Sequence, residues 1–162
     1  NSYRLETFRS NELGCLGYAD SDEQAVFYRT TTKSHTQDAE FDIDSVHTLP
    51  RVDIAYAYAG ADGLLVRALV EAGVAGIVAG GLGSGGSPSK MMAALKTATQ
   101  SGIPVVIATQ TGNGRVVRTR RYDEDGYIVA DNLSPKKTRI LLMLALTKTK
   151  DPEEIQRMML TY

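Results

Sequence analysis

The chain is poor in the residues that cross-link small proteins or bind metals. It has no tryptophan, one cysteine and two histidines in 162 residues. Cys15 cannot form a disulfide within the chain, and no cysteine or histidine lies near it at metal-ligand spacing. His35 and His47 stand in a polar segment, which favours solvated or docking roles over metal coordination. The sequence therefore predicts an inert thiol and no metal or cofactor site.

A surplus of one charge and a long apolar run are also missing. Eighteen basic and nineteen acidic residues give a formal net charge of -1, so no overall field attracts nucleic acid or anionic lipid. The longest apolar run, Ile140–Leu146, is far shorter than the ~18 residues of a membrane span. We predict neither nucleic acid nor a membrane as a partner. The chain opens at Asn1 without an initiator methionine, and we expect it to be a fragment.

The first third of the chain predicts a β-hairpin followed by a linker. Cys15–Tyr18 and Ala25–Arg29 are strand-like runs separated by the turn-rich residues 20–23. A two-stranded hairpin is marginal alone, so we expect it to belong to a sheet outside this chain or to pack on the later domain. Residues 30–49 are polar with few apolar positions, which is typical of a linker.

From residue 50 onward, strands and helices alternate. The first strand lies within Leu49–Ala61, and Gly60 ends it where the chain must turn. We expect further strands at Val74–Ala79, after Pro104 and near Tyr127–Ala130. Two strand-helix-strand crossovers within about sixty residues require parallel pairing.

Helix signals stand between and after these strands. A first helix is predicted from about Gly63 to Ala72. Three others are predicted to begin with a capping residue followed by proline, at Ser87-Pro88, Ser134-Pro135 and Asp151-Pro152. The sequence thus predicts an α/β fold: a small doubly wound, flavodoxin-like domain with about four parallel strands, preceded by a β-hairpin and a linker.

Two motifs suggest phosphate binding, and each has a plainer interpretation. Gly81–Gly86 matches G-x-G-x-x-G after a strand, but the next strand ends Ala108-Thr109-Gln110 without the acidic residue that would hold a ribose. We interpret this loop as structural or pocket-lining, and keep nucleotide binding as an alternative. The basic run Arg115–Arg121 is interpreted as a solvated loop balanced by the acidic residues 123–125.

No complete catalytic set is visible in the chain. Ser84 lies between glycines as in a nucleophile elbow, but position 82 is leucine where the elbow needs glycine, and both histidines precede the serine. Asp62 is expected to cap the first helix, although a carboxylate at the carboxyl end of a parallel strand also lies where an α/β ligand site forms. Any catalytic machinery is expected outside this chain.

A series of short stretches, spread over essentially the whole chain, is similar in order and spacing to one family. The stretches are Lys33–Thr36, Phe41-Asp42, Leu49–Ile54, Tyr56, Tyr58, Ala75–Val78, Thr111–Gly114, Asn132–Lys137, Arg139–Thr147 and Thr149–Tyr162. Together they resemble the C-terminal half of the bacterial-type type II L-asparaginases and glutaminase-asparaginases.

The resemblance implies a two-domain subunit. Residues 1–33 would end the N-terminal catalytic domain and include its hairpin, residues 34–50 would be the linker, and residues 51–162 would be the C-terminal α/β domain. The catalytic threonines would precede Asn1, so this fragment alone is expected to be inactive. The implied partners are the N-terminal domain, further copies in a homodimer or homotetramer, and a small amino-acid substrate.

The loop after the first strand is the implied contribution to a neighbouring subunit's active site. The family offers an Asn or Asp there that touches the substrate amino group; the matching position is Gly60, and Asp62 would take its place two residues on. A family glutamate has no clear counterpart, because the aligned region falls on Thr119–Arg121 and Glu124 is several residues away.

The chemistry implied by the resemblance is amide hydrolysis. A threonine nucleophile would release ammonia from asparagine, or from glutamine, without a metal or cofactor. The resemblance implies a periplasmic or secreted protein, with the cytoplasm as the alternative. A different class stays open beside this one: a non-catalytic α/β ligand-binding or assembly domain.

Overall fold

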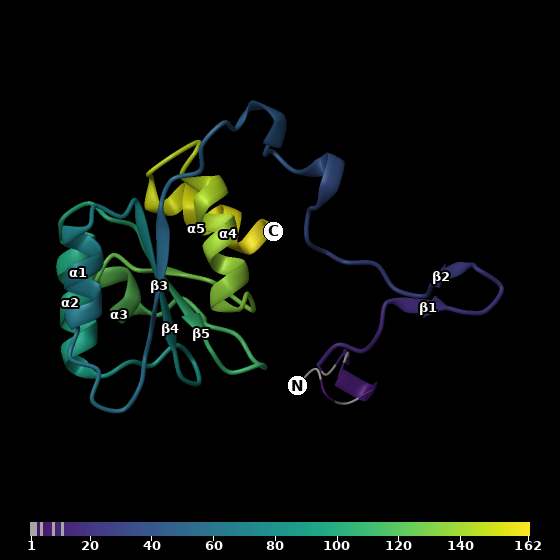
Figure 1. Ribbon diagram of the computed structural model, residues 1–162, viewed down its shortest axis with the longest axis horizontal. Coiled ribbons are helices and arrows are strands. Elements are labelled where there is room, and N and C mark those ends of the chain that lie inside the picture. Colours follow the sequence, from purple (N-terminus) through teal and green to yellow (C-terminus); the bar gives the residue numbers. More distant parts are fainter. Residues whose placement is uncertain (1–2, 4, 8, 11) are drawn as a thin grey trace. The chain divides into compact units, whose positions relative to one another are not determined.

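The chain forms two compact units. The computed structural model describes residues 3, 5–7, 9–10 and 12–162. The units are Asn1–Ser34 and His35–Tyr162, and the second contains the parallel sheet (Figure 1).

The predicted hairpin is confirmed in the first unit. β1 (Gly17–Ala19) pairs antiparallel with β2 (Ala25–Phe27). Both strands are shorter than the predicted runs. Leu16 O accepts the backbone N–H of both Tyr28 and Arg29, and this two-against-one arrangement ends the regular ladder.

The second unit is built on a four-stranded parallel sheet, as predicted. Its strands β3 (Val52–Tyr56), β4 (Gly76–Gly81), β5 (Val105–Thr109) and β6 (Ile128–Val129) lie in the order β3-β4-β5-β6. β4 begins later than predicted and includes two glycines of the expected loop, because these glycines pair with β3 and β5. Since the strands are parallel, the loops after them meet at one edge of the sheet.

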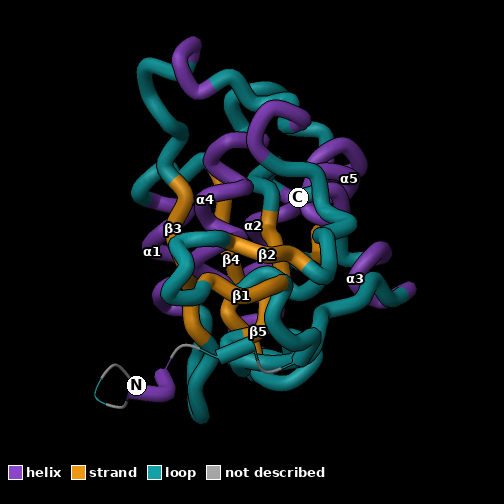
Figure 2. Tube along the Cα trace, turned by 90° about the vertical axis from the view of Figure 1, so that its right-hand side faces the viewer, coloured by secondary structure: helices purple, strands orange, loops and turns teal. Residues whose placement is uncertain are grey.

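Helices cover both faces of this sheet, which gives the predicted α/β fold, although the order of the described strands lacks the reversal of a flavodoxin-like sheet. α1 (Leu64–Glu71), α2 (Ser89–Gln100) and the short α3 (Arg120–Glu124) pack on one face. α4 (Pro135–Ala145) and α5 (Pro152–Thr161) pack on the other. Figure 2 views the chain from the side of α4 and α5.

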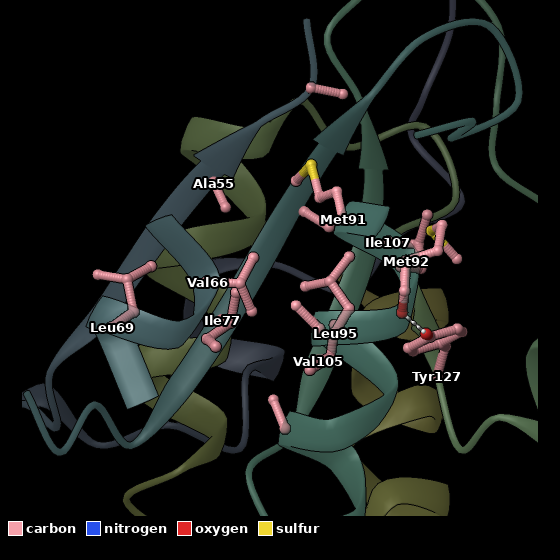
Figure 3. Close-up of a cluster of buried hydrophobic side chains, with 14 of the residues drawn as sticks. Ala55, Val66, Leu69, Ile77, Met91, Met92, Leu95, Val105, Ile107 and Tyr127 are labelled. Atoms are coloured by element: carbon pink, nitrogen blue, oxygen red, sulfur yellow. Dashed lines mark hydrogen bonds between the residues drawn. The ribbon is translucent and has the colours of Figure 1, made fainter. Parts of the chain in front are cut away.

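Two apolar cores lie between the helices and the sheet. Side chains alternate along each strand, so that Ile77 and Ile107 belong to the core under α1 and α2, whereas Val78 and Val106 belong to the core under α4 and α5. Figure 3 shows the first core, in which Leu95 of α2 packs among the strand residues. Burial of each such side chain contributes about 1.5–3 kcal/mol.

Two of the three predicted cap-and-proline helix starts are confirmed. α4 and α5 each begin at their proline, after Ser134 and Asp151. The prediction for α2 is wrong by one residue. Pro88 is itself the N-cap and the helix begins at Ser89, because ψ of Pro88 is 147°, an extended value that excludes it from the first turn. Ser87 therefore lies outside the helix.

The segment that composition marks as a linker packs on α5. Tyr162 Oη accepts the backbone N–H of Glu40 at 2.9 Å and donates to Glu40 Oε1 at 3.0 Å. Arg157 Nη2 donates to both carboxylate oxygens of Glu40, at 2.7 and 2.9 Å. The rings of Phe41 and Tyr162 lie 5.1 Å apart. Residues 34–50 therefore have the polar composition of a linker, but one glutamate and one aromatic pair hold this segment against α5 and Tyr162.

We expect Tyr162→Phe to release this segment while the domain stays folded. The substitution leaves the part-buried Glu40 N–H without its acceptor, which costs about 1–2 kcal/mol. Hydrogen exchange followed by mass spectrometry should become faster in residues 38–42 and stay unchanged in α4. Tyr28→Phe, at an exposed ring of the first unit, is the control. Equal exchange of residues 38–42 in the two variants would contradict this docking.

Candidate functional site

The loops after the four parallel strands form the edge where an α/β domain builds a ligand site. They comprise residues 57–63, 82–88, 110–119 and 130–134. The described strands follow one another in sheet order, so no reversal of strand order opens a crevice between them. The shape of this edge is therefore set by the loops.

A tight turn after β3 carries Gly60, the first predicted site residue. Ala61 N donates to Tyr58 O at 3.1 Å, which closes a β-turn over residues 58–61. Gly60 has a φ of +84°, the value that the third position of a type II turn requires and that glycine or asparagine adopts. A Cβ added at Gly60 would meet nothing within 4 Å. The predicted turn is confirmed, and it presents open main chain at the edge of the sheet.

Asp62, the second predicted site residue, is not the N-cap of α1 as predicted, because Gly63 takes that position; Asp62 lies one residue earlier and hydrogen-bonds the first residue of the helix. Its Oδ1 accepts the backbone N–H of Leu64 at 2.9 Å. This hydrogen bond is the main reason that the pKa of the carboxyl lies below its usual value, and the charges of Arg67 and Lys90 lower it further. The side chain is exposed and lines a groove between α1 and α2. Asp62 is therefore an ionised, accessible carboxylate at neutral pH, with one oxygen engaged.

The glycine-rich loop after β4 is folded on itself. Leu82 N donates to Gly86 O at 2.8 Å, and the N–H groups of Gly85 and Gly86 donate to Leu82 O at 3.0 and 2.7 Å. These three N–H groups are therefore not available to a phosphate. Together with residues 57–59, the loop lines a depression of about 420 Å³ beside the Gly60 turn. The interpretation as a structural, pocket-lining loop is confirmed.

Ion pairs neutralise part of the basic run: Asp123 and Glu124 pair with it as predicted, whereas Asp125 pairs with Lys96 of α2. Arg118 donates to the two carboxylate oxygens of Glu153 at 2.8 and 2.5 Å and also to Asp123, and the bonds to Glu153 are the largest cause of its raised pKa. Arg120 Nε lies 2.8 Å from Glu124 Oε1. A run compensated in this way has little attraction left for phosphate.

The region that aligns with the family glutamate begins α3, a helix that the sequence did not predict. Thr119 Oγ1 accepts the backbone N–H of Tyr122 at 3.3 Å and so caps the helix. The ring of Tyr122 packs on the core under α1 and α2, 5.9 Å from the ring of Tyr127. The helix was not predicted because its basic residues were interpreted as part of a solvated loop. Its available signals are the capping threonine and the Arg120–Glu124 pair at helical spacing.

Gln110, which no sequence pattern singled out, connects two loops of this edge. Its Nε2 donates to Ala57 O at 2.8 Å, and its backbone N donates to Gly81 O at 2.8 Å. A polar residue after a buried strand carries no local signal of such a long-range contact. Only the assembled sheet brings Gln110 and Ala57 together.

The edge offers a ligand the open turn at Gly60, the depression beside this turn and the Asp62 carboxylate. Within residues 3, 5–7, 9–10 and 12–162, no group of three or more His, Cys, Asp or Glu side chains could hold a metal ion. His35 and His47, for which solvated or docking roles were predicted, precede β3. Among the same described residues, no helix is both long and apolar enough to cross a membrane.

Comparison with known proteins identifies the family to which this chain belongs. Residues 51–159 match the family model of the glutaminase/asparaginase C-terminal domain. L-asparaginase 2 of Bacillus subtilis is 39% identical over 156 residues, which cover 96% of this chain and 41% of that protein. The probable periplasmic L-asparaginase of Haemophilus influenzae is 34% identical over 155 residues, which cover 94% of this chain and 44% of that protein.

A solved structure agrees with these sequence matches. The probable cytoplasmic L-asparaginase of Campylobacter jejuni superposes with a TM-score of 0.93 at 39% identity, over 100% of this chain and 52% of that chain. This chain therefore spans about half the length of the relatives it matches. Its relatives include one described as periplasmic and one as cytoplasmic. Sequence, fold and extent of the match agree that the chain belongs to the family of glutaminase/asparaginase C-terminal domains.

Proposed function

We propose that the protein containing this chain is an amidohydrolase that converts asparagine, and glutamine as a second substrate, to the acid and ammonia. One observation carries the proposal: the whole chain matches asparaginases, and it covers about half of each. We place the nucleophilic threonine in the half that this chain does not cover, so the chain alone is expected to be inactive.

The proposed reaction follows from a threonine nucleophile. The threonine oxygen attacks the side-chain amide carbon, a base takes the hydroxyl proton, and ammonia leaves with a proton from the enzyme. Water then attacks the resulting ester, releases aspartate or glutamate and restores the threonine hydroxyl. Hydrogen-bond donors stabilise the oxyanion in both steps.

The proposed subunit has two domains. Residues 1–33 end the N-terminal catalytic domain, residues 34–50 link the domains, and residues 51–162 form the C-terminal domain. The division of the chain into two units after Ser34 supports this arrangement. The hairpin supports it too, because Tyr18, Phe27 and Tyr28 are 59%, 71% and 75% exposed, and so apolar a hairpin needs a larger sheet to cover it.

The role proposed for this domain is to close the active site of a neighbouring subunit in a homodimer or homotetramer. Gly60 would present main chain to the bound substrate, and the Asp62 carboxylate would orient its ammonium group. Both residues are exposed at the carboxyl edge of the sheet, which supports the proposal. The hydrogen bond from Leu64 occupies one position on Asp62 Oδ1 and leaves acceptor capacity for a cation.

Asp62→Asn separates substrate binding from the hydrogen bond to Leu64 N, because the side-chain oxygen of asparagine also accepts a hydrogen bond but carries no charge. We expect kcat/KM for asparagine to fall about 10- to 100-fold, since a hydrogen bond to a charged group contributes about 1.5–3 kcal/mol. The temperature of unfolding should not change. Ammonia release by the whole protein and thermal unfolding are the two measurements.

The matched control for this test is Asp44→Asn, an exposed aspartate in the docked segment. It should leave both kcat/KM and thermal unfolding unchanged. If Asp62→Asn behaves like this control, Asp62 serves only the hydrogen bond to Leu64 N and has no place in the substrate site.

A non-catalytic assembly or ligand-binding domain is the second candidate. Gly60 favours it, because the turn lacks the Asn or Asp side chain that the family's loop offers. Ammonia release distinguishes the two. A correctly assembled whole protein that hydrolyses neither asparagine nor glutamine would support the second candidate.

For the compartment, we propose the periplasm or the exterior of the cell. The relative from Haemophilus influenzae, described as periplasmic, supports this proposal, and the cytoplasmic relative from Campylobacter jejuni defines the alternative. Fractionation of cells that express the whole protein decides between them.

A further inference from the structure

Gln110 joins two strands that are not neighbours in the sheet. It follows β5, and its Nε2 donates at 2.8 Å to the carbonyl of Ala57, the residue directly after β3. β4 lies between these two strands, so the side chain crosses the end of β4. We propose that Gln110 is a positioning residue for the Gly60 turn and, through this turn, for substrate binding in the neighbouring subunit.

Backbone hydrogen bonds to β4 hold both residues of this hydrogen bond, Gln110 and Ala57, in place. Gln110 N donates to Gly81 O at 2.8 Å, and Ala57 N donates to Gly80 O at 2.8 Å, so both residues are held against the last residues of β4. Ala57 is also buried, with 5% of its surface exposed. Because the two ends are fixed, the amide of Gln110 determines the direction in which the chain leaves β3.

The turn beyond Ala57 has little else to hold it. Tyr58 is 62% exposed, and a Cβ at Gly60 would meet nothing within 4 Å. Ala61 anchors the far end through its buried side chain and its hydrogen bond to Tyr58 O. Among the described residues, Gln110 is the side chain that hydrogen-bonds the main chain of residues 57–61. Loss of this bond therefore leaves the near end of the turn held only by the Ala57 N–H and the buried Ala57 side chain.

This inference rests on the proposed function. Gly60 has no side chain, so it can present only main chain to a substrate, and main chain cannot re-aim by changing rotamer. A shift of the turn by about 1 Å therefore shifts the contact by as much, which is enough to weaken binding considerably. Gln110 would thus act on substrate binding without touching the substrate.

Two substitutions remove the donor while changing the shape of the side chain little. Gln110→Met keeps the length and has no donor. Gln110→Glu keeps the shape but brings a carboxylate towards the carbonyl of Ala57, where two acceptors repel each other. Gln100→Met is the matched control, because Gln100 is an exposed glutamine at the end of α2.

The experiment combines kinetics and hydrogen exchange on the whole protein. We expect KM for asparagine to rise about 5- to 20-fold in both Gln110 variants, with kcat unchanged within about twofold, because the lost interaction serves substrate binding. Amide exchange in residues 58–64 should become about tenfold faster, while exchange in β4 and β5 stays the same. Gln100→Met should change neither quantity.

The outcomes separate this proposal from the proposed function. Unchanged exchange in residues 58–64 overturns the positioning role, and so does faster exchange with an unchanged KM, which would make the bond merely structural. If the wild-type protein releases no ammonia from either amide, the proposed function fails. The exchange of residues 58–64 then shows by itself whether Gln110 holds the turn.

Discussion

Replacing Gln156 by alanine is expected to lower the free energy of unfolding by about 4 kcal/mol. β6 pairs with β5 on one side and with no described strand on the other. On that second side, the buried side chain of Gln156 hydrogen-bonds the backbone of β6 in place of a strand. Its Oε1 accepts from Val129 N at 2.9 Å and its Nε2 donates to Val129 O at 3.1 Å. Alanine would leave both backbone groups buried and unpaired, at about 1–3 kcal/mol each.

Urea unfolding followed by circular dichroism measures this loss. Gln100→Ala is the control, because that glutamine is exposed and should cost less than about 0.5 kcal/mol. Similar losses in the two variants would contradict the role given to Gln156 at the edge of β6.

Gln156→Glu gives the same position a pH dependence. A protonated carboxyl can accept from Val129 N and donate to Val129 O as the amide does, whereas a carboxylate cannot donate. Burial raises the pKa of such a glutamate above its unfolded value of about 4.3. The two hydrogen bonds of the protonated carboxyl therefore stabilise the fold fully below about pH 4. This stabilisation is lost as the pH rises through the raised pKa of the folded state. The stability gap to wild type should therefore widen from pH 4 to pH 7; a constant gap would contradict this.

Gly63→Ala is the second large effect, with an expected loss of about 3 kcal/mol. Gly63 precedes α1 with a φ of +83°, and a Cβ there would lie 2.7 Å from Ala94 Cβ and 3.0 Å from Lys90 O. The positive φ costs alanine about 1–2 kcal/mol. Pushing α1 away from α2 costs about 1–3 kcal/mol more.

Gly73→Ala isolates the backbone part of this cost. Gly73 has a φ of +70°, but a Cβ there would meet nothing within 4 Å. Guanidinium unfolding should therefore show a loss smaller by about 2 kcal/mol for Gly73→Ala than for Gly63→Ala. Equal losses would contradict the close approach of α1 and α2.

The architecture could be predicted from the sequence because short apolar runs alternate with amphipathic, capped helices. Val74–Ala79 already indicated a fully buried parallel strand. The errors lie where local composition and tertiary pairing disagree. Gly80 and Gly81 look like loop residues but pair within the sheet, and the basic residues around Arg120 hide a short helix that Tyr122 anchors in the core.

The candidate site could be predicted only as far as local backbone geometry determines it. Gly60 was predictable as a turn, because that role depends on residues one to three positions away, whereas the cap predicted at Asp62 falls one residue later, at Gly63. Gln110 and Gln156 were not predictable. Their hydrogen bonds join residues 53 and 27 positions apart, and no pattern in a single sequence indicates such contacts.

Complementation between two inactive variants of the whole protein tests most directly whether this domain completes a neighbour's amidohydrolase site. One variant lacks the proposed nucleophilic threonine of the half that this chain does not cover. The other carries Gly60→Trp, whose side chain would extend from the open turn into the neighbouring site. Mixed oligomers contain sites with an intact threonine and an intact turn, so ammonia release from asparagine should recover to about a quarter of the wild-type rate. No recovery, or full activity of Gly60→Trp alone, would contradict the account.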